Sequence, residues 1–161
     1  LTQEDVLLPL MECIVNSIIS LQQSELSEGE KKIQIQIFRG ELPQSPTFEN
    51  VKTINSFKII DNGIGFNSKN YLSFKTPFSQ INKDYGCKGV GRFTVLAAYE
   101  KYCVDSNYKE NGKWFNRIFS FTVEKEVNKI DFKKSESQNY KTTVDLENCN
   151  NPIVLEKLAL L

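Results

Sequence analysis

Three short groups of residues in this sequence combine carboxylate, amide and glycine in patterns suited to nucleotide chemistry. They are the pair Glu12 and Asn16, the segment 61–65, and the segment 86–91. They supply a carboxylate one helical turn from an amide, a single acid followed by two glycines, and a loop whose backbone N–H groups can surround phosphates. A protein needs this combination to hold a purine nucleoside triphosphate through a magnesium ion and attack it with water.

Glu12 and Asn16 are four residues apart, so on a helix both side chains project from the same face. Asn16 offers a neutral oxygen, a ligand type that suits magnesium, which also keeps waters and shares phosphate oxygens. Glu12 could orient and deprotonate the attacking water. The alternative is a solvated polar pair on an ordinary amphipathic helix.

Asp61 ends an apolar stretch and is followed by Gly63 and Gly65. A buried carboxylate at this place is costly without hydrogen-bond donors, and the exocyclic amine of adenine, with a water or hydroxyl, would supply them. The two glycines permit backbone conformations with positive φ and let a ring approach closely. The alternative is a simple turn after a strand, because Asp-Asn-Gly is common turn chemistry.

Gly86, Gly89 and Gly91 precede a predicted helix, so backbone N–H groups and the helix dipole could receive phosphate oxygens there. Lys88 could contact a phosphate or could simply be solvated. The segment lacks the Gly-Lys-Ser/Thr ending of a Walker loop, and its spacing differs from the dinucleotide fingerprint. Neither a P-loop nor a nicotinamide site is therefore indicated.

Hydrophobic periodicity predicts the elements that would position these residues. Residues 3–24 form a predicted helix, and its apolar stripe should pack on a sheet: Val6, Leu7, Leu10, Ile14, Val15, Ile18 and Leu21. A second helix is predicted over residues 90–99, and a short terminal helix could begin at Pro152.

The remaining elements are predicted to be strands and loops. Strands are predicted over residues 33–38, 57–60, 102–106, 113–124, 127–132 and 140–146. Asn111-Gly112 is a strong hairpin signal, and residues 66–88 read as a mobile loop containing a short helix. We therefore expect an α+β two-layer sandwich.

The composition predicts an ordinary globular domain and excludes several classes of site. The 161 residues are 40% hydrophobic and 25% charged, and a chain of this length buries roughly 70% of its surface on folding. Twenty basic and twenty acidic side chains cancel, which disfavours direct binding of nucleic acid or an anionic membrane by this segment. No apolar run approaches the ~20 residues of a membrane span. Because there is no histidine, imidazole bases and a phospho-accepting histidine within this chain are excluded.

The cysteines and the chain ends bear on cellular context. Cys13, Cys87, Cys103 and Cys149 are widely spaced and form no Cys-x-x-Cys pair. We therefore expect reduced thiols in an intracellular, cytoplasmic protein. The sequence starts without methionine at a helix-like stretch, so we expect a single domain over residues 1–161 that is a fragment of a larger polypeptide.

Taken together, the motifs resemble those of the GHKL superfamily of ATP-binding domains, which includes gyrase B, heat-shock-90 chaperones, histidine kinases and MutL proteins. Glu12-x-x-x-Asn16, Asp61-x-Gly63-x-Gly65 and Gly86-x-x-Gly89-x-Gly91 are similar to that family's first, adenine and lid motifs. The segment 142–146 is similar to the fourth motif, in which Thr142 fits the threonine of the adenine-binding network. The resemblance covers roughly residues 5–147 and holds in family order.

The resemblance implies a mixed, mostly antiparallel sheet covered on one face by helices, with ATP and Mg²⁺ bound between the helices and the lid. Asp61 would then read adenine with support from Thr142, and Phe66 would line the pocket. Asn16 would hold magnesium, Glu12 would activate water, and the lid glycines would hold phosphates. Implied partners are ATP, other domains of the same polypeptide and an ATP-dependent homodimer.

The sequence departs from the family pattern at three places. Lys141 stands where glycine usually precedes the threonine, and Ile19-Ser20 stands where family ATPases often carry Asp-Ala. No basic residue is assigned as a sensor of the γ-phosphate, a group that relatives often supply from a following domain.

Two other functions remain open on the sequence. A histidine-kinase catalytic domain would act on a histidine elsewhere, although a carboxylate at Glu12 favours hydrolysis, because a kinase needs no base for water. A nucleotide-sensing module would bind without turnover and control an attached effector.

Overall fold

The computed structural model describes residues 7–41, 52–76, 91–122 and 128–149, which form three helices and six strands. In chain order these elements are α1 (Leu8–Gln22), β1 (Ile33–Glu41), β2 (Lys52–Asp61), α2 (Ser68–Lys75), α3 (Gly91–Ala98), β3 (Tyr99–Glu110), β4 (Lys113–Thr122), β5 (Asn128–Lys134) and β6 (Lys141–Cys149).

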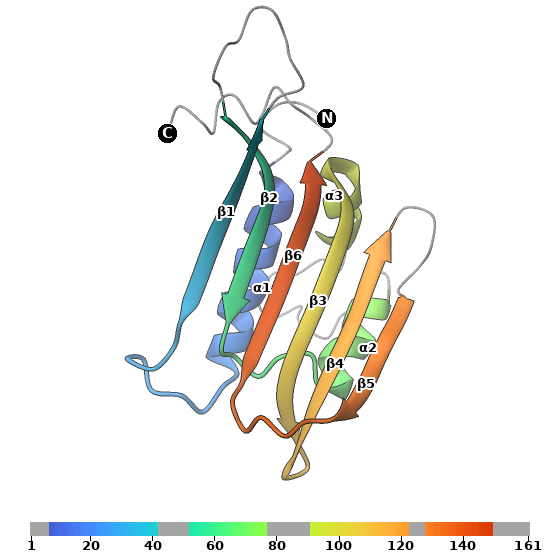
Figure 1. The fold of residues 1–161 in the computed structure, drawn as a ribbon. Coiled ribbons are helices and arrows are strands. Elements are labelled where there is room, and N and C mark those ends of the chain that lie inside the picture. Colours follow the sequence, from blue (N-terminus) through green and yellow to red (C-terminus); the bar gives the residue numbers. More distant parts are fainter. Residues whose placement is uncertain (1–6, 42–51, 77–90, 123–127, 150–161) are drawn as a thin grey trace, which may run out of the picture.

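The six strands form one sheet in the order β1-β2-β6-β3-β4-β5. Every pair of neighbouring strands among them is antiparallel. All three helices lie on the same face of the sheet (Figure 1), so the predicted α+β two-layer architecture is confirmed. The last strand, β6, is inserted between β2 and β3, and this crossover brings residues distant in sequence next to the end of β2.

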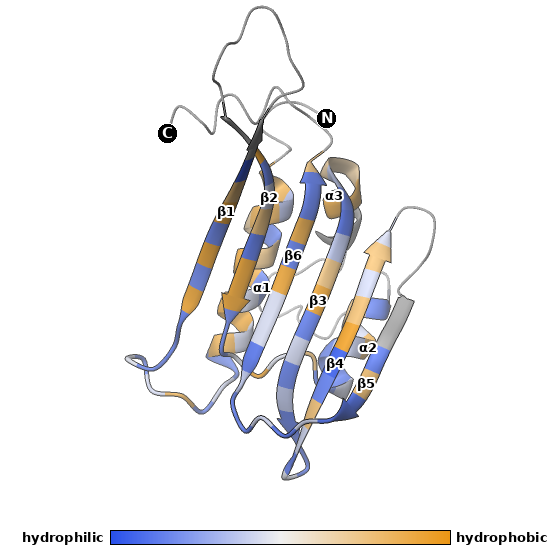
Figure 2. Ribbon diagram, viewed as in Figure 1, coloured by the Kyte–Doolittle hydropathy of each residue, from blue (hydrophilic) through white to orange (hydrophobic). Residues whose placement is uncertain are grey.

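Hydrophobic and hydrophilic residues alternate along the central strands (Figure 2), which explains why these strands bury one face. Phe57 and Ile59 of β2 and Val144 and Leu146 of β6 point to the helix side and are at most 5% exposed, as the period of two predicts. β1 and β2 extend beyond the predicted bounds, through Glu41 and back to Lys52. The two strands remain paired beyond a register shift between Phe38 and Arg39. The predicted bounds were too short because the hydrophobic pattern of one strand does not show how far it pairs with its neighbour.

The face of α1 that packs on the sheet differs from the predicted stripe. Its buried residues are Pro9, Cys13, Ser17, Ile19 and Leu21. In contrast, Val15 and Ile18 are 39% and 42% exposed. The prediction was wrong for these two because apolar residues surround most of this helix, so spacings of three and four fit more than one face. The helix begins at Leu8, with Pro9 in its first turn, a position that suits proline. The predicted start before Leu7 lies outside the described residues.

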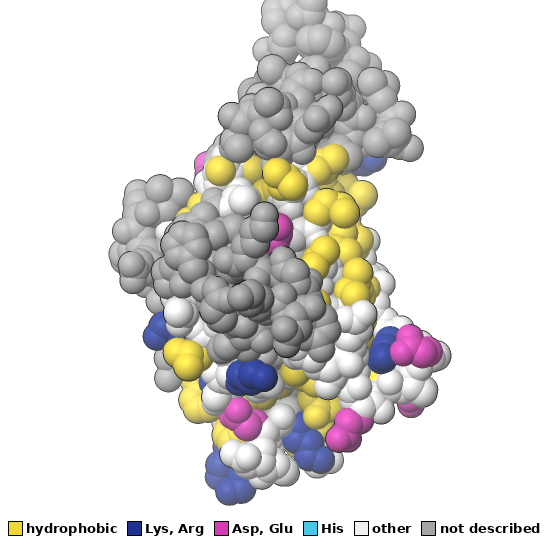
Figure 3. All heavy atoms as spheres, turned by 180° about the vertical axis from the view of Figure 1, so that it is seen from behind, with side chains coloured by type: hydrophobic (Ala, Val, Ile, Leu, Met, Phe, Trp, Pro, Cys, Tyr) yellow, Lys and Arg dark blue, Asp and Glu magenta, His cyan; other side chains and the backbone are white. Residues whose placement is uncertain are grey.

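The outward face of α1 therefore carries an apolar stripe of its own, formed by Leu8, Met11, Val15 and Ile18. Two isoleucines of the neighbouring edge strand, Ile35 and Ile37, are also exposed. Figure 3, which shows the helix side, has hydrophobic side chains gathered along this part of the surface.

A cluster of aromatic rings attaches α2 to the other half of the sheet. Asn67 caps the helix by accepting a hydrogen bond from the Asn70 N–H at 2.9 Å. Phe74 contacts the rings of Tyr102, Phe119 and Phe121. The short helix predicted within residues 66–88 is thus present, and the rest of that segment, from residue 77, lies outside the described residues.

Asn111 and Gly112 form the turn between β3 and β4, both with positive φ (50° and 75°). This is the backbone conformation of a type I′ hairpin, so the sequence prediction is confirmed at this turn.

None of the helices in the described ranges is long and apolar enough to cross a membrane. Cys13, Cys103 and Cys149 are free thiols, and burial, with a smaller contribution from Glu12, raises the pKa of Cys13 to about 12.

Substitution of two isoleucines on neighbouring strands should lower the free energy of unfolding by very different amounts. Ile59 is 0% exposed and Ile37 is 51% exposed. We expect Ile59→Ala to lower the free energy of unfolding by about 2–5 kcal/mol. Ile37→Ala should cost less than about 1 kcal/mol. Urea denaturation of both variants measures this, and equal losses would contradict the assigned core.

Candidate functional site

Asp61 lies at the end of β2, where the sheet meets α1, and its side chain is only 4% exposed. The Ser17 hydroxyl on α1 donates to Asp61 Oδ2 at 2.8 Å. The Gly63 N–H donates to Oδ1 at 2.9 Å. The carboxylate is thus buried, and each of its oxygens accepts one hydrogen bond from the described part of the chain. A carboxylate oxygen can accept more than one hydrogen bond, so capacity remains for donors from a ligand.

Burial raises the pKa of the Asp61 carboxyl, while the hydrogen bonds from Ser17 and Gly63 act in the opposite direction. The carboxylate is therefore held where its charge is costly, with two donors that offset part of that cost. Strongly buried carboxylates with few partners are common at functional sites.

Thr142 lies opposite Asp61 on the neighbouring strand, β6. Its side chain is 3% exposed and its hydroxyl is 2.9 Å from the hydroxyl of Ser106 on β3. Ser106 also accepts a hydrogen bond from the Phe66 N–H at 2.9 Å. Asp61, Thr142 and Ser106 thus form a row of polar groups across three adjacent strands, on the face that the helices cover.

The turn after Asp61 crosses over this row and is fastened to α1. Ser20 accepts from Gly65 through its hydroxyl (3.2 Å) and from Ile64 through its backbone carbonyl (3.2 Å). A Cβ at Gly63 would lie 2.6 Å from the backbone carbon of Ser20, so only glycine fits without movement of the helix. Gly65 has φ +69°, and a Cβ there would crowd Ser106 and Thr142. Both glycines are therefore required by close approach.

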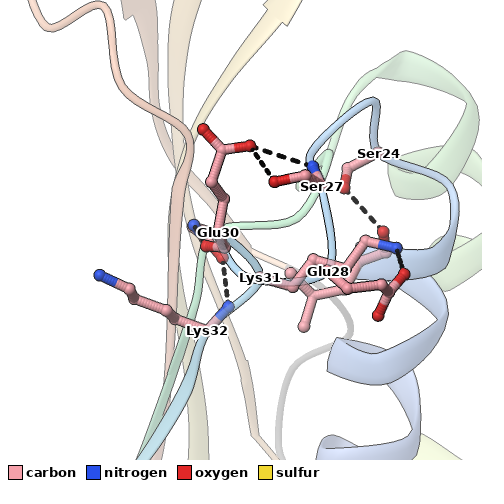
Figure 4. Close-up of polar contacts among 8 residues, drawn as sticks. Ser24, Ser27, Glu28, Glu30, Lys31 and Lys32 are labelled. Carbon is pink, nitrogen blue, oxygen red and sulfur yellow. Dashed lines mark hydrogen bonds and ion pairs between the residues drawn. The ribbon is translucent and has the colours of Figure 1, made fainter.

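Asn62 fastens the same turn to the connection between α1 and β1. It accepts from the Lys32 N–H at 2.8 Å and donates to the Glu30 carbonyl at 2.9 Å. Figure 4 shows this connection, in which the Glu30 carboxylate accepts from both the N–H and the hydroxyl of Ser27. The second residue of the motif thus has a structural role that does not depend on a ligand.

Glu12 and Asn16 lie on α1 in line with Ser20, at successive intervals of four residues. Asn16 is exposed and Glu12 is half-buried. No group of three or more acidic, cysteine or histidine side chains that could hold a metal by itself occurs in the described part of the chain. Asn16 offers a single amide oxygen, so a magnesium ion bound there would take its remaining ligands from water and from the phosphates of a nucleotide.

Phe66 is half-buried and packs against the hydrophobic core. Its ring makes edge contacts with Phe74 and Phe119, with centroids 5.7 and 5.1 Å apart. Of the lid glycines, Gly91 is the first residue of α3. Gly86, Lys88 and Gly89 lie outside the described residues.

Three serines that complete the network were not predicted as site residues from the sequence: Ser17, Ser20 and Ser106. Ser17 lies four residues after the buried Cys13 on the sheet-facing side of α1. A polar residue on this otherwise apolar face of the helix could have indicated a buried hydrogen bond. Ser106 lies on the same face of β3 as the buried Tyr102 and Val104. Ser20 carried no signal of its own, because it contacts the turn only through the tertiary fold.

Comparison with known proteins identifies the fold. No family model and no curated protein matches the sequence. The ATPase region of Saccharomyces cerevisiae topoisomerase II, in a structure bound to ICRF-187 (dexrazoxane), superposes with a TM-score of 0.62 and 12% identity. The match covers 94% of this chain and 42% of that one.

A second structure of the ATPase region of that protein matches over 63% of this chain and 33% of its own, with a TM-score of 0.48 and 11% identity. The chain thus spans less than half the length of these structures. The first match shows that the chain has the fold of a GHKL-type ATPase domain.

The packing of the turn on α1 makes a specific prediction about two glycines. In Gly63→Ala the added Cβ meets Ser20 and the Leu21 N–H, at 2.6 Å from the Ser20 carbon and 2.8 Å from the nitrogen. We expect a loss of about 1–3 kcal/mol in the free energy of unfolding. Gly29→Ala is the control, because nothing lies within 4 Å of its Cβ. Urea denaturation that shows the same stability for both variants would contradict the close approach.

Proposed function

We propose that this chain is an ATP-binding domain that hydrolyses ATP in a magnesium-dependent manner and couples the reaction to closure of its lid segment. The observation that carries the proposal is the buried Asp61 at the end of β2, with Thr142 opposite and a glycine turn above. The superposition on an ATPase region supports the proposal, because the same architecture there belongs to an ATPase.

In the proposed complex, Asp61 accepts a hydrogen bond from the exocyclic amine of adenine. Ser17 and the Gly63 N–H each hold one oxygen of the carboxylate, which fixes the orientation of the group. Thr142 supports the ring through its hydroxyl or a bound water. Gly63 and Gly65 keep the turn narrow enough for a flat ring to approach the sheet. We assign Phe66 to the wall of this pocket, through its place in the aromatic cluster beneath α2.

The triphosphate would extend from this pocket along α1. Asn16 is the proposed magnesium ligand, and Glu12, one turn earlier, is the proposed base that orients and deprotonates water. Gly86, Lys88, Gly89 and Gly91 are the proposed phosphate ligands. Magnesium, when bound, would neutralise charge on the phosphates.

The proposal also concerns the rest of the polypeptide. Because the superposed structure is more than twice as long as this chain, we propose that further domains of the same polypeptide use the nucleotide cycle. We further propose that one of them supplies the cation that stabilises the γ-phosphate, and that ATP favours a homodimer.

The adenine assignment predicts that Asp61→Asn loses nucleotide affinity. An amide in this place presents its NH₂ group to the adenine amine, and loss of a hydrogen bond to a charged group costs about 1.5–3 kcal/mol. We therefore expect ATP and ADP to bind roughly 10- to 100-fold more weakly. Calorimetric titration measures the change, and unchanged affinity would remove Asp61 from the site.

The same variant should remain folded, and the pKa of Asp61 gives the sign of the effect on stability. Because burial raises the pKa of the folded-state carboxyl, stability contributed by its protonated form is lost as the pH rises through that pKa. We expect Asp61→Asn to be at least as stable as the parent at neutral pH. The advantage should disappear in acid. A variant that is unfolded at neutral pH would contradict this.

The catalytic assignment predicts that Glu12→Ala still binds ATP and magnesium but turns over about 100-fold more slowly, the lower end of the range for loss of a general base. The matched control is Glu28→Ala, an exposed carboxylate in the connection after α1. Phosphate release should be measured in the full-length protein, where the stabilising cation is present. Parental turnover in Glu12→Ala would show that Glu12 is not the base, whereas absence of turnover in the parent as well would favour a nucleotide sensor.

A further inference from the structure

Arg117 of β4 is a buried cation without a carboxylate partner in the described part of the chain. Arg117 is only 7% exposed. None of the ion pairs among the described residues includes Arg117. Burial of an unpaired charge is costly unless other groups compensate. The groups around Arg117 therefore show why the charge is kept there.

Two backbone carbonyls at the end of the turn after Asp61 accept hydrogen bonds from Arg117 and offset part of the cost of burying its charge. Nη1 of Arg117 donates to the carbonyl of Phe66 at 2.5 Å and to that of Asn67 at 3.0 Å. Three aromatic rings offset the rest of this cost. The guanidinium carbon lies 4.4, 5.2 and 5.1 Å from the ring centroids of Tyr71, Tyr108 and Phe132, within the range of cation–π attraction.

These contacts join the sheet to α2. Tyr71 belongs to α2, whereas Tyr108 and Phe132 belong to β3 and β5. A planar guanidinium can bond to carbonyls at its edge and stack on rings with its faces, which a lysine ammonium cannot reproduce. The geometry therefore requires arginine specifically, not only a positive charge.

The carbonyls that Arg117 holds belong to the residues that join the glycine turn to α2. Asn67 caps α2, and Asn70 in the first turn donates back to the Gly65 carbonyl at 2.8 Å. The Phe66 N–H is bonded to Ser106, next to Thr142. Arg117 thus fixes residues 66 and 67, which connect the turn after Asp61 to α2.

We infer that Arg117 is a positioning residue for the nucleotide site, acting through the Phe66 and Asn67 carbonyls to hold the glycine turn and α2 in their binding arrangement. The effect on nucleotide affinity rests on the proposed function, whereas the effect on the turn and α2 does not. Because Arg117 acts on the adenine end, its loss should change KM and Kd more than kcat.

The first test measures amide hydrogen exchange without nucleotide, in Arg117→Met and Arg117→Lys. The Tyr71 N–H, bonded to the Asn67 carbonyl, should exchange at least about 10-fold faster in Arg117→Met, with an intermediate rate in Arg117→Lys. Strands β2 and β6 should keep parental rates. The controls are Arg39→Met and Arg39→Lys, which change an exposed arginine on β1. Parental exchange at Tyr71, or equal acceleration across the whole sheet, would overturn the positioning role.

The second test measures ATP binding and steady-state turnover of the same variants in the full-length protein. Arg117→Met should raise Kd and KM at least about 10-fold and leave kcat at saturating ATP within about twofold. Partial recovery in Arg117→Lys should match its exchange rates. Parental Kd and KM, or a fall in kcat alone, would overturn the inference. If the parent binds no adenine nucleotide, the proposed function fails, and the exchange measurement still decides whether Arg117 holds the turn.

Discussion

The site depends on one unfavourable interaction, the burial of the Asp61 carboxylate at the end of a central strand. Water is largely excluded from this group, so its charge must be stabilised by donors in fixed positions. The described residues provide two, from Ser17 and Gly63, and burial still raises the pKa of the acid. In the proposed complex, an amine of the ligand that donates to the remaining lone pairs would relieve part of this cost.

The surrounding architecture follows from the need to place donors and flat surfaces around that acid. The crossover that inserts β6 between β2 and β3 puts Thr142 and Ser106 beside Asp61. α1 approaches closely enough for Ser17 and Ser20 to reach the acid and the turn, and this approach requires glycine at position 63. The second half of the sheet contributes through α2, which the aromatic cluster and Arg117 attach to β4. The same contacts thus pack α1 and α2 on the sheet and position the residues of the candidate site.

Much of this arrangement could be predicted from the sequence, because motif residues and strand alternation are local signals. The order of helices and strands, the turn at Asn111-Gly112 and the burial of Asp61 all follow from neighbouring residues. The buried face of α1 could not be predicted in the same way, because Val15 and Ile18 are as apolar as residues that face the sheet. The hydroxyl network was also missed, since Ser20 and Ser106 meet the turn only after β3 and α1 are packed. Arg117 gave no signal either, because its partners are backbone carbonyls and rings from four separate elements.

Binding of adenine to Asp61 beside Thr142 can be tested with a crystal structure of the protein that contains magnesium and a non-hydrolysable ATP analogue. We expect the adenine amine to lie within hydrogen-bond distance of an Asp61 carboxylate oxygen. Ser17 and the Gly63 N–H should still bond to the acid, and the triphosphate should extend along α1. Density for the nucleotide elsewhere on the protein, or an Asp61 carboxylate contacted only by Ser17 and Gly63 in the complex, would contradict it.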